Sequence, residues 1–156
     1  AAQTGHLVLS TLHTNSAVEA ITRLRHMGVA PWQIAGSLQL VIAQRLVRLL
    51  CPSCKAPQTL SANQWQQLGG ESQHPVQVYA PVGCSACHQG YRGRTGIFQA
   101  LTISPTIQDC IVQEAPTPTL QHHAMQQGMR SLRQAGLAKV QQGLTSLQEV
   151  LAVSHG

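Results

Sequence analysis

The feature that most constrains this chain is a pair of two-cysteine motifs, CPSC at Cys51–Cys54 and CSAC at Cys84–Cys87. Two residues between the cysteines of a pair let both sulfur atoms turn toward one point, so two pairs supply four ligands for a tetrahedral ion. The 29 residues from Lys55 to Gly83 between the pairs are typical of a zinc site with two knuckles. We therefore predict that structural zinc is bound by Cys51, Cys54, Cys84 and Cys87.

Two other uses of these thiols stay open. A redox role of the thioredoxin type places CxxC at the start of a helix, whereas Cys51 follows an expected helix end. Disulfides are less expected, because no basic and apolar signal peptide opens the sequence, which favours a cytosolic location. His88 follows Cys87 directly but is not needed as a ligand when four sulfurs are present, and Cys110 is most simply a small core residue.

The charge and composition limit the other chemistries. Ten Lys and Arg against five Asp and Glu give a formal net charge of +5, which favours anionic partners. Asp109 is the only Asp, so we expect no carboxylate pair for acid–base catalysis and no carboxylate magnesium site within this chain. Aromatic residues make up 3% of the chain, which disfavours single-strand nucleic-acid binding, since that needs stacked aromatic rings.

The apolar pattern of the first fifty residues predicts an α/β arrangement. Residues 6–12 form a short apolar run typical of a buried strand in a parallel sheet. A capping box formed by Ser16 and Glu19 begins a helix that ends near Gly28. A second helix is predicted to run from Pro31 to Leu50, because its apolar residues recur at helical spacing.

The rest of the chain is predicted to alternate loops with short elements. Between the cysteine pairs, one helix capped by Ser61 and Gln64 is expected in a segment with too few apolar groups to hold itself together. The motif GYRGRTG predicts a turn, followed by a strand over residues 95–101. Helix starts at Ser104-Pro105, Thr117-Pro118, Ser131 and the TSLQ motif after Gly143 then predict a small helical bundle.

Two histidines mark the ends of the first expected strand, in TGHLVLSTLHTNSA. Strand geometry would separate His6 and His13 by roughly 23 Å and turn them to opposite faces, so they cannot share one metal ion. His13 would lie at the carboxyl end of a parallel strand, where α/β sheets bind ligands.

This stretch resembles the histidine box of the secretion ATPases, the P-loop motor family that powers type II secretion and type IV pilus assembly. The resemblance continues in order through AITRL, MGV, IAQRLVRLLCPSCK, GYRGRTGIF and GMRSLRQAGLAKVQQGLTSLQEVL, and so covers nearly the whole chain. Both CxxC pairs point to the assembly and secretion branch, because the retraction branch usually lacks this metal lobe. Phe98-Gln99 departs from the Tyr-Glu that is commoner in the family, which leaves open any salt bridge made by that acid.

The resemblance implies an α/β fold. Residues 1–50 would be the C-terminal part of a RecA-like P-loop NTPase core, 51–90 a four-cysteine zinc-binding lobe, and 91–156 a strand plus a C-terminal helical subdomain. In that family a P-loop and an acidic box precede the histidine box, and neither motif occurs here. The chain is therefore expected to be the C-terminal half of the motor and inactive alone.

The resemblance also implies a setting and site residues. It implies a homo-hexameric ATPase that uses ATP and Mg on the cytoplasmic face of a bacterial inner membrane, with a platform protein and other secretion or pilus components as partners. By position, His13 would contact the γ-phosphate and His6 would support the strand or a neighbouring subunit. Arg92 and Arg94 would lie near the nucleotide or a subunit boundary. For the histidines the alternative is a plain residue at a strand end, and for the two arginines it is a solvated turn.

Two other functions stay open. A zinc-ribbon nucleic-acid-binding module is suggested by the paired knuckles and the charge of +5, although Lys55 is the only cation between the first and last cysteines of the two pairs. A noncatalytic scaffold without a P-loop is the other possibility. The motor interpretation expects no nucleic acid as a partner. His122 and His123 lie on a polar predicted helix with no partner nearby in the sequence, so they are expected at the surface.

Overall fold

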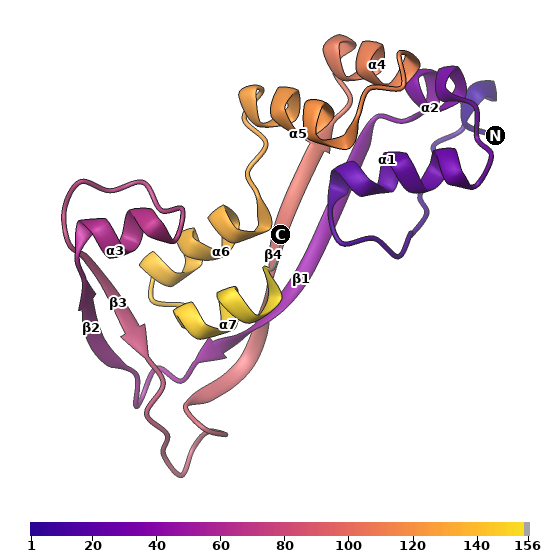
Figure 1. Ribbon diagram of the computed structural model, residues 1–156. Helices are drawn as coiled ribbons and strands as arrows, with labels where there is room; N and C mark the ends of the chain where they lie inside the picture. Colours follow the sequence, from indigo (N-terminus) through magenta and orange to yellow (C-terminus); the bar gives the residue numbers. More distant parts are fainter. Residues whose placement is uncertain (155–156) are drawn as a thin grey trace. The chain divides into compact units, whose positions relative to one another are not determined.

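The computed structural model of the protein describes residues 1–154. In chain order its elements are η1 (Ala2–Thr4), α1 (Ala17–His26), α2 (Pro31–Ser37), β1 (Leu40–Leu50), β2 (Ala56–Leu60), α3 (Ala62–Gln67), β3 (Val76–Ala80), β4 (Tyr91–Thr102), α4 (Pro105–Val112), α5 (Thr117–Gln126), α6 (Leu132–Gln141) and α7 (Leu147–Val153) (Figure 1). Strand β1 pairs with β4, and β2 pairs antiparallel with β3, with Ala56 opposite Ala80 and Leu60 opposite Val76. Among the described residues, no helix is both long and apolar enough to cross a membrane.

The chain divides into two compact units, each made of two separate stretches. Unit 1 contains Ala1–Ala43 and Gln99–Arg130, and unit 2 contains Gln44–Phe98 and the residues from Ser131 on. Helices α4 and α5 therefore belong to unit 1, whereas α6 and α7 belong to unit 2. This division differs from the expected one, because two of the four C-terminal helices fall in each unit.

Unit 1 is built around one apolar cluster. Helix α1 begins as predicted, with the Ser16 hydroxyl accepting from the Glu19 amide at 3.2 Å, and it ends before Gly28, whose φ of +86° suits glycine. Prolines lie in the first turns of α2, α4 and α5. A backbone N–H at these positions would have no partner within the helix, so its absence in proline costs no hydrogen bond. The largest fully buried side chains of this cluster are Val18, Ile21, Leu101, Ile107 and Ile111.

The predicted helix over residues 31–50 is only partly correct. Helix α2 ends at Ser37, and Leu40–Leu50 form strand β1, paired with β4. Within β1, Ala43 and Val47 are buried while their neighbours are more exposed. A spacing of four fits both one helical turn and two strand repeats, so the apolar pattern could not separate them. The pairing with β4 decides in favour of the strand.

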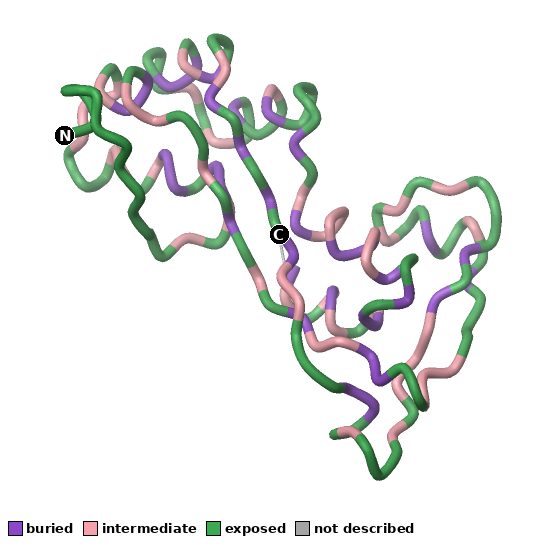
Figure 2. The backbone as a smooth tube through the Cα atoms, turned by 180° about the vertical axis from the view of Figure 1, so that it is seen from behind, coloured by how far each residue is buried: buried purple, intermediate pink, exposed green. Residues whose placement is uncertain are grey.

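The predicted strand over residues 6–12 is wrong for this structure. These residues lie in no helix or strand, and the first thirteen residues are exposed along the trace (Figure 2). Leu7 is 84% and Leu9 is 87% exposed. A strand needs a neighbour to satisfy its backbone groups, and no strand of residues 1–154 pairs with this segment.

Unit 2 joins the cysteine-bearing segment to the C-terminal helices. The Ser61–Gln64 capping box is confirmed at the start of α3, and Leu60 and Trp65 pack in one cluster. The segment was expected to have too few apolar groups to hold itself together, and its buried residues do form a core only together with residues of α6 and α7. That core contains Leu60, Trp65, Val76, Val78, Leu137, Val140 and Val150. Gly136 lets α6 approach α7, since a Cβ there would lie 2.4 Å from a Val150 methyl carbon.

The predicted strand over residues 95–101 is confirmed within the longer β4. The motif GYRGRTG, predicted as a turn, instead forms the beginning of this strand from Tyr91 on. Gly93 has a φ of +82°, which is a local irregularity that glycine permits within a strand.

Candidate metal centre

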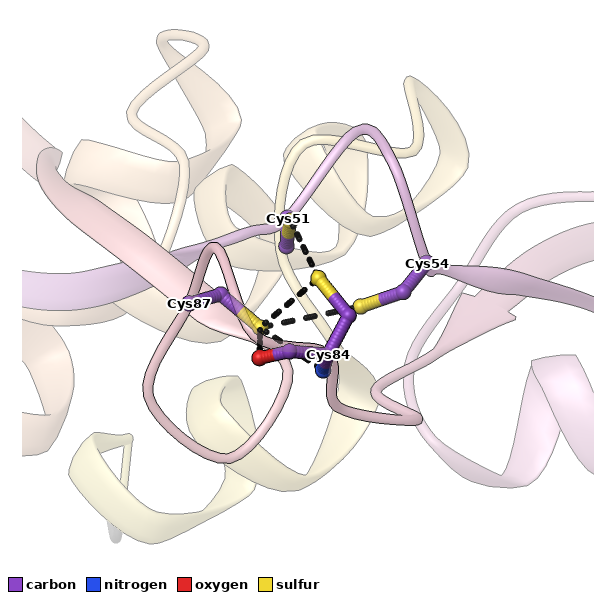
Figure 3. Close-up of side chains that lie close together, drawn as sticks. All are labelled: Cys51, Cys54, Cys84 and Cys87. Atoms are coloured by element: carbon purple, nitrogen blue, oxygen red, sulfur yellow. Dashed lines mark hydrogen bonds between the residues drawn. The ribbon is translucent and has the colours of Figure 1, made fainter.

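The four cysteines of the two CxxC motifs converge on one point (Figure 3). Cys51 and Cys54 lie on the connection from β1 to β2, and Cys84 and Cys87 lie on the connection from β3 to β4. Their four sulfur atoms lie within 4.8 Å of one another. They are the one such group of potential metal ligands within the described part of the chain.

The spacing of the sulfur atoms fits a tetrahedral divalent ion. Sulfur–sulfur distances are 4.0 Å for Cys51 and Cys84, 3.7 Å for Cys54 and Cys87, and 3.7 Å for Cys84 and Cys87. Four thiolates at about 2.3 Å from a zinc ion would lie roughly 3.8 Å apart. A disulfide would instead need about 2.05 Å, and all five cysteines are free.

Backbone hydrogen bonds shape the two knuckles. In the first knuckle, the Lys55 amide donates to the Cys51 carbonyl at 3.1 Å. In the second, the Cys84 amide donates to the Cys87 sulfur at 3.3 Å, which places a backbone dipole on a sulfur. The Cys51 amide donates to the Gly90 carbonyl at 2.8 Å and so joins the first knuckle to the end of the second.

The thiols differ in acidity before any ion binds. Burial raises the pKa of the Cys54 thiol to about 11, because the thiolate loses solvation. Burial acts in the same direction on Cys87, but hydrogen bonds from Cys84 and from the Gly90 backbone outweigh it and lower the pKa to about 7. Cys87 is therefore the thiol that deprotonates more readily of the two. Metal ligands of this kind bind as thiolates, so affinity for an ion rises with pH.

The chain just before the first knuckle contacts residues that lie far away in the sequence, and sequence patterns did not predict these contacts. The Arg48 guanidinium binds the Glu149 carboxylate at 2.6 Å and lies 4.1 Å from the centre of the Tyr91 ring. No sequence signal links Arg48 to Glu149 because 101 positions separate them.

The predicted histidines belong to one unit and the predicted arginines to the other. His6 and His13 precede α1 in unit 1, and Arg92 and Arg94 lie on β4 in unit 2; all four are exposed. The Nδ1 atom of His6 lies 3.1 Å from the Thr4 hydroxyl. His13 has no hydrogen-bond partner among residues 1–154.

Gln99 occupies the position where the resemblance predicts an acid. Its side chain is buried, at 4% exposure, and its Oε1 atom accepts from the Ala17 amide at 2.9 Å. Ala17 is the first residue of α1, so Gln99 satisfies an amide that the helix itself leaves without a partner. Sequence reasoning noted the departure but not this contact, which joins residues 82 positions apart.

Comparisons with known proteins give a consistent result. The family model described as type II/IV secretion system protein matches residues 1–152. The type IV pilus assembly ATPase PilB of Acinetobacter baylyi is 47% identical, covering 99% of this chain and 27% of that protein. The type II secretion system ATPase E of Vibrio cholerae is also 47% identical, covering 99% of this chain and 31% of that protein. The chain thus spans about a third or less of these relatives.

A solved structure supports the fold. The pilus retraction motor PilT with bound ADP matches with a TM-score of 0.59 over 99% of this chain and 34% of that one, at 22% identity. At this identity the likeness shows an α/β fold similar to that of the motor. The family match over residues 1–152 and the two relatives at 47% identity show that the chain belongs to the type II/IV secretion system protein family.

Proposed function

We propose that this chain is the C-terminal part of an ATPase that powers type IV pilus assembly or type II secretion. The observation that carries the proposal is the 47% identity, across 99% of the chain, to proteins named for each of these activities. The two systems are not separated by this identity, because both relatives match equally well.

His13 is proposed to contact the γ-phosphate of ATP. Its exposed imidazole has no hydrogen-bond partner within the described chain, so a ring N–H is available to a phosphate oxygen. A protonated ring would add charge assistance to the same hydrogen bond. Preorganised donors of this kind stabilise the charge that develops on the transferred phosphoryl group. His6 is proposed to support this segment or a neighbouring subunit.

Arg92 and Arg94 are proposed to act near the nucleotide or at a subunit boundary. Both residues are exposed, and they lie two positions apart on β4, on either side of Gly93, whose positive φ interrupts the regular strand. Arginine is suited to a phosphate because its planar donors match two oxygens at once. In this proposal the protein works as a homo-hexamer on the cytoplasmic face of the inner membrane, with Mg and a P-loop supplied outside this chain.

The four cysteines are proposed to hold zinc in a structural role. Four sulfur ligands close the coordination shell and leave no position for water or substrate, so the ion would stabilise the fold without catalysing a reaction. The zinc-bearing lobe is proposed to help contact an inner-membrane platform protein. Unchanged recruitment of a protein lacking this lobe would argue against that contact.

ATP hydrolysis by the full-length protein tests the motor proposal. We expect Mg-dependent turnover that falls by roughly a hundredfold in His13→Ala, the size of effect seen when one transition-state donor is lost. His122→Ala is the matched control, because His122 is exposed and bonds only Gln126 in its own helix. The isolated chain is expected to show no turnover above background. Turnover by the isolated chain that survives His13→Ala would contradict the assignment.

A further inference from the structure

Lys55 connects the first cysteine knuckle to a distant turn. It follows Cys54 directly, and its Nζ atom donates to the Gly143 carbonyl at 2.7 Å, across 88 positions of sequence. The same ammonium lies 4.4 Å from the centre of the Tyr79 ring. A charge-assisted hydrogen bond and a cation–π contact together hold this side chain in one orientation.

The other flank of the knuckle is held by the same turn. The Leu50 amide donates to the Leu144 carbonyl at 2.9 Å, and the Thr145 hydroxyl donates to the Arg48 carbonyl at 2.7 Å. The Arg48 backbone amide donates to the Glu149 carboxylate at 3.0 Å. Residues 143–149, which lead into α7 and form its first turn, therefore contact the chain immediately before Cys51 and immediately after Cys54.

Gly143 allows the approach of Lys55 and Tyr79. Its φ is +68°, and a Cβ at this position would lie 2.8 Å from Tyr79 Cδ2 and 3.1 Å from Lys55 Nζ. Any side chain here would have to displace both groups. The turn is thus shaped to receive the ammonium that follows the first cysteine pair.

We propose that Lys55 is a positioning residue of the metal site, which couples occupancy of the four cysteines to the order of residues 143–153. The inference rests on the proposed metal site. Four thiolates around a divalent ion leave a net negative charge, and an adjacent cation fixed by the Gly143 carbonyl lowers the cost of gathering that charge. An ion that orders the knuckle in turn fixes Lys55, Leu50 and Arg48 as partners for the turn.

The test compares the only two lysines of the chain. Lys55→Met removes the ammonium and keeps an unbranched stem, and Lys139→Met removes the same charge elsewhere in unit 2, where Nζ bonds the Thr95 hydroxyl. Affinity for Zn²⁺ is measured by competition with a chromophoric chelator. We expect roughly tenfold weaker binding for Lys55→Met, as for other groups that orient metal ligands, and an unchanged affinity for Lys139→Met.

Hydrogen exchange gives a second readout of the same coupling. In the unaltered protein, Zn²⁺ should slow amide exchange over residues 143–153, and in Lys55→Met this protection should shrink while that of the cysteine knuckles persists. A purely local role for Lys55 would leave the protection of residues 143–153 intact.

A pair of glycine variants keeps the test decisive if Lys55→Met does not fold. Gly143→Ala and Gly128→Ala both place alanine at positive φ, +68° and +91°, but a Cβ at Gly128 meets nothing within 4 Å. We expect weaker Zn²⁺ binding only for Gly143→Ala. The double variant Lys55→Met/Gly143→Ala should bind Zn²⁺ no more weakly than whichever single variant binds it less tightly. Both changes disturb the same contact between Lys55 and Gly143, so their effects should not add.

The outcomes separate the two proposals. If the unaltered protein does not bind Zn²⁺, the proposed metal site and the coupling both fall. If it binds Zn²⁺ and the two lysine variants bind equally well, the coupling is overturned and the metal site stands.

Discussion

Unit 1 and unit 2 bury different kinds of groups. Within the described residues, unit 1 encloses one cluster of fourteen buried residues, whereas the clusters of unit 2 contain seven and three buried residues. Unit 2 instead holds the four cysteines, the Arg48–Glu149 pair and the Lys55–Gly143 bond. Unit 1 also has polar links, such as Gln99–Ala17 and Arg25–Glu114, so the difference lies in the single apolar cluster of unit 1 and the cysteine group of unit 2.

Removing the proposed metal ligands should have the largest effect and should act on unit 2 alone. Zinc binding to structural sites of this type contributes on the order of 10 kcal/mol, so Cys54→Ser or chelation should sharply increase hydrogen exchange over residues 48–60 and 143–153. Exchange in α1, α4 and α5 should not change. Cys110→Ser is the control, because Cys110 is buried in unit 1 and outside the cysteine cluster. Loss of protection in both units on chelation would break the comparison.

A cavity in the core of unit 1 should have the next largest effect. Ile107 is fully buried, so Ile107→Ala should lower the free energy of unfolding of unit 1 by about 2–5 kcal/mol. Denaturant unfolding followed by exchange in α4 measures this. Ile42→Ala, at a side chain that is 55% exposed, should change stability by less than about 0.5 kcal/mol. A lower affinity for Zn²⁺ in Ile107→Ala would show that the units do not respond separately.

Acidification should have the smallest of these effects on stability. It should act on the ion pair of unit 2 more than on the ion pair of unit 1. The hydrogen bond from Arg48 holds the pKa of the Glu149 carboxyl below its usual value of 4.5. The stabilisation from this pair is therefore complete above pH 4.5 and is lost as the pH falls through the lower folded-state pKa. Since Arg48 is 41% exposed, Glu149→Gln should cost only about 1 kcal/mol at neutral pH.

The control for this prediction is the ion pair of unit 1. Glu114, which bonds Arg25, is 59% exposed, so Glu114→Gln should cost less than about 0.5 kcal/mol. Stability curves for the two glutamine variants between pH 3 and 7 test the difference. If Glu149→Gln retains the acid sensitivity of the unaltered protein over that range, another group is responsible for it.

Features set by neighbouring residues were predictable from the sequence. The CxxC spacing anticipated the convergence of four sulfurs, and the serine caps anticipated the starts of helices such as α1, α3 and α6. These signals are local, because each involves residues three positions apart. Pairing across the chain was not predictable. Strand β1 looked helical because its partner β4 lies far along the sequence.

The candidate metal site likewise has features that the sequence predicted and contacts that it did not. The cysteines were found from spacing alone, but Lys55–Gly143 and Arg48–Glu149 join positions 88 and 101 apart. A single sequence carries no signal for such contacts. The exposure of Leu7 and Leu9 was missed for a related reason, because their apolar character indicates burial without specifying a partner.

Gln99 gives the start of α1 an attachment that does not titrate. A carboxylate in its place would gain a proton in acid and would then bind the Ala17 amide less strongly, whereas a carboxamide stays neutral at every pH in which the protein folds. Acidification that loosens the Arg48–Glu149 pair thus leaves this anchor unchanged. The segment leading from His13 into α1 accordingly ends at a hydrogen bond that neither gains nor loses a proton while the protein is folded.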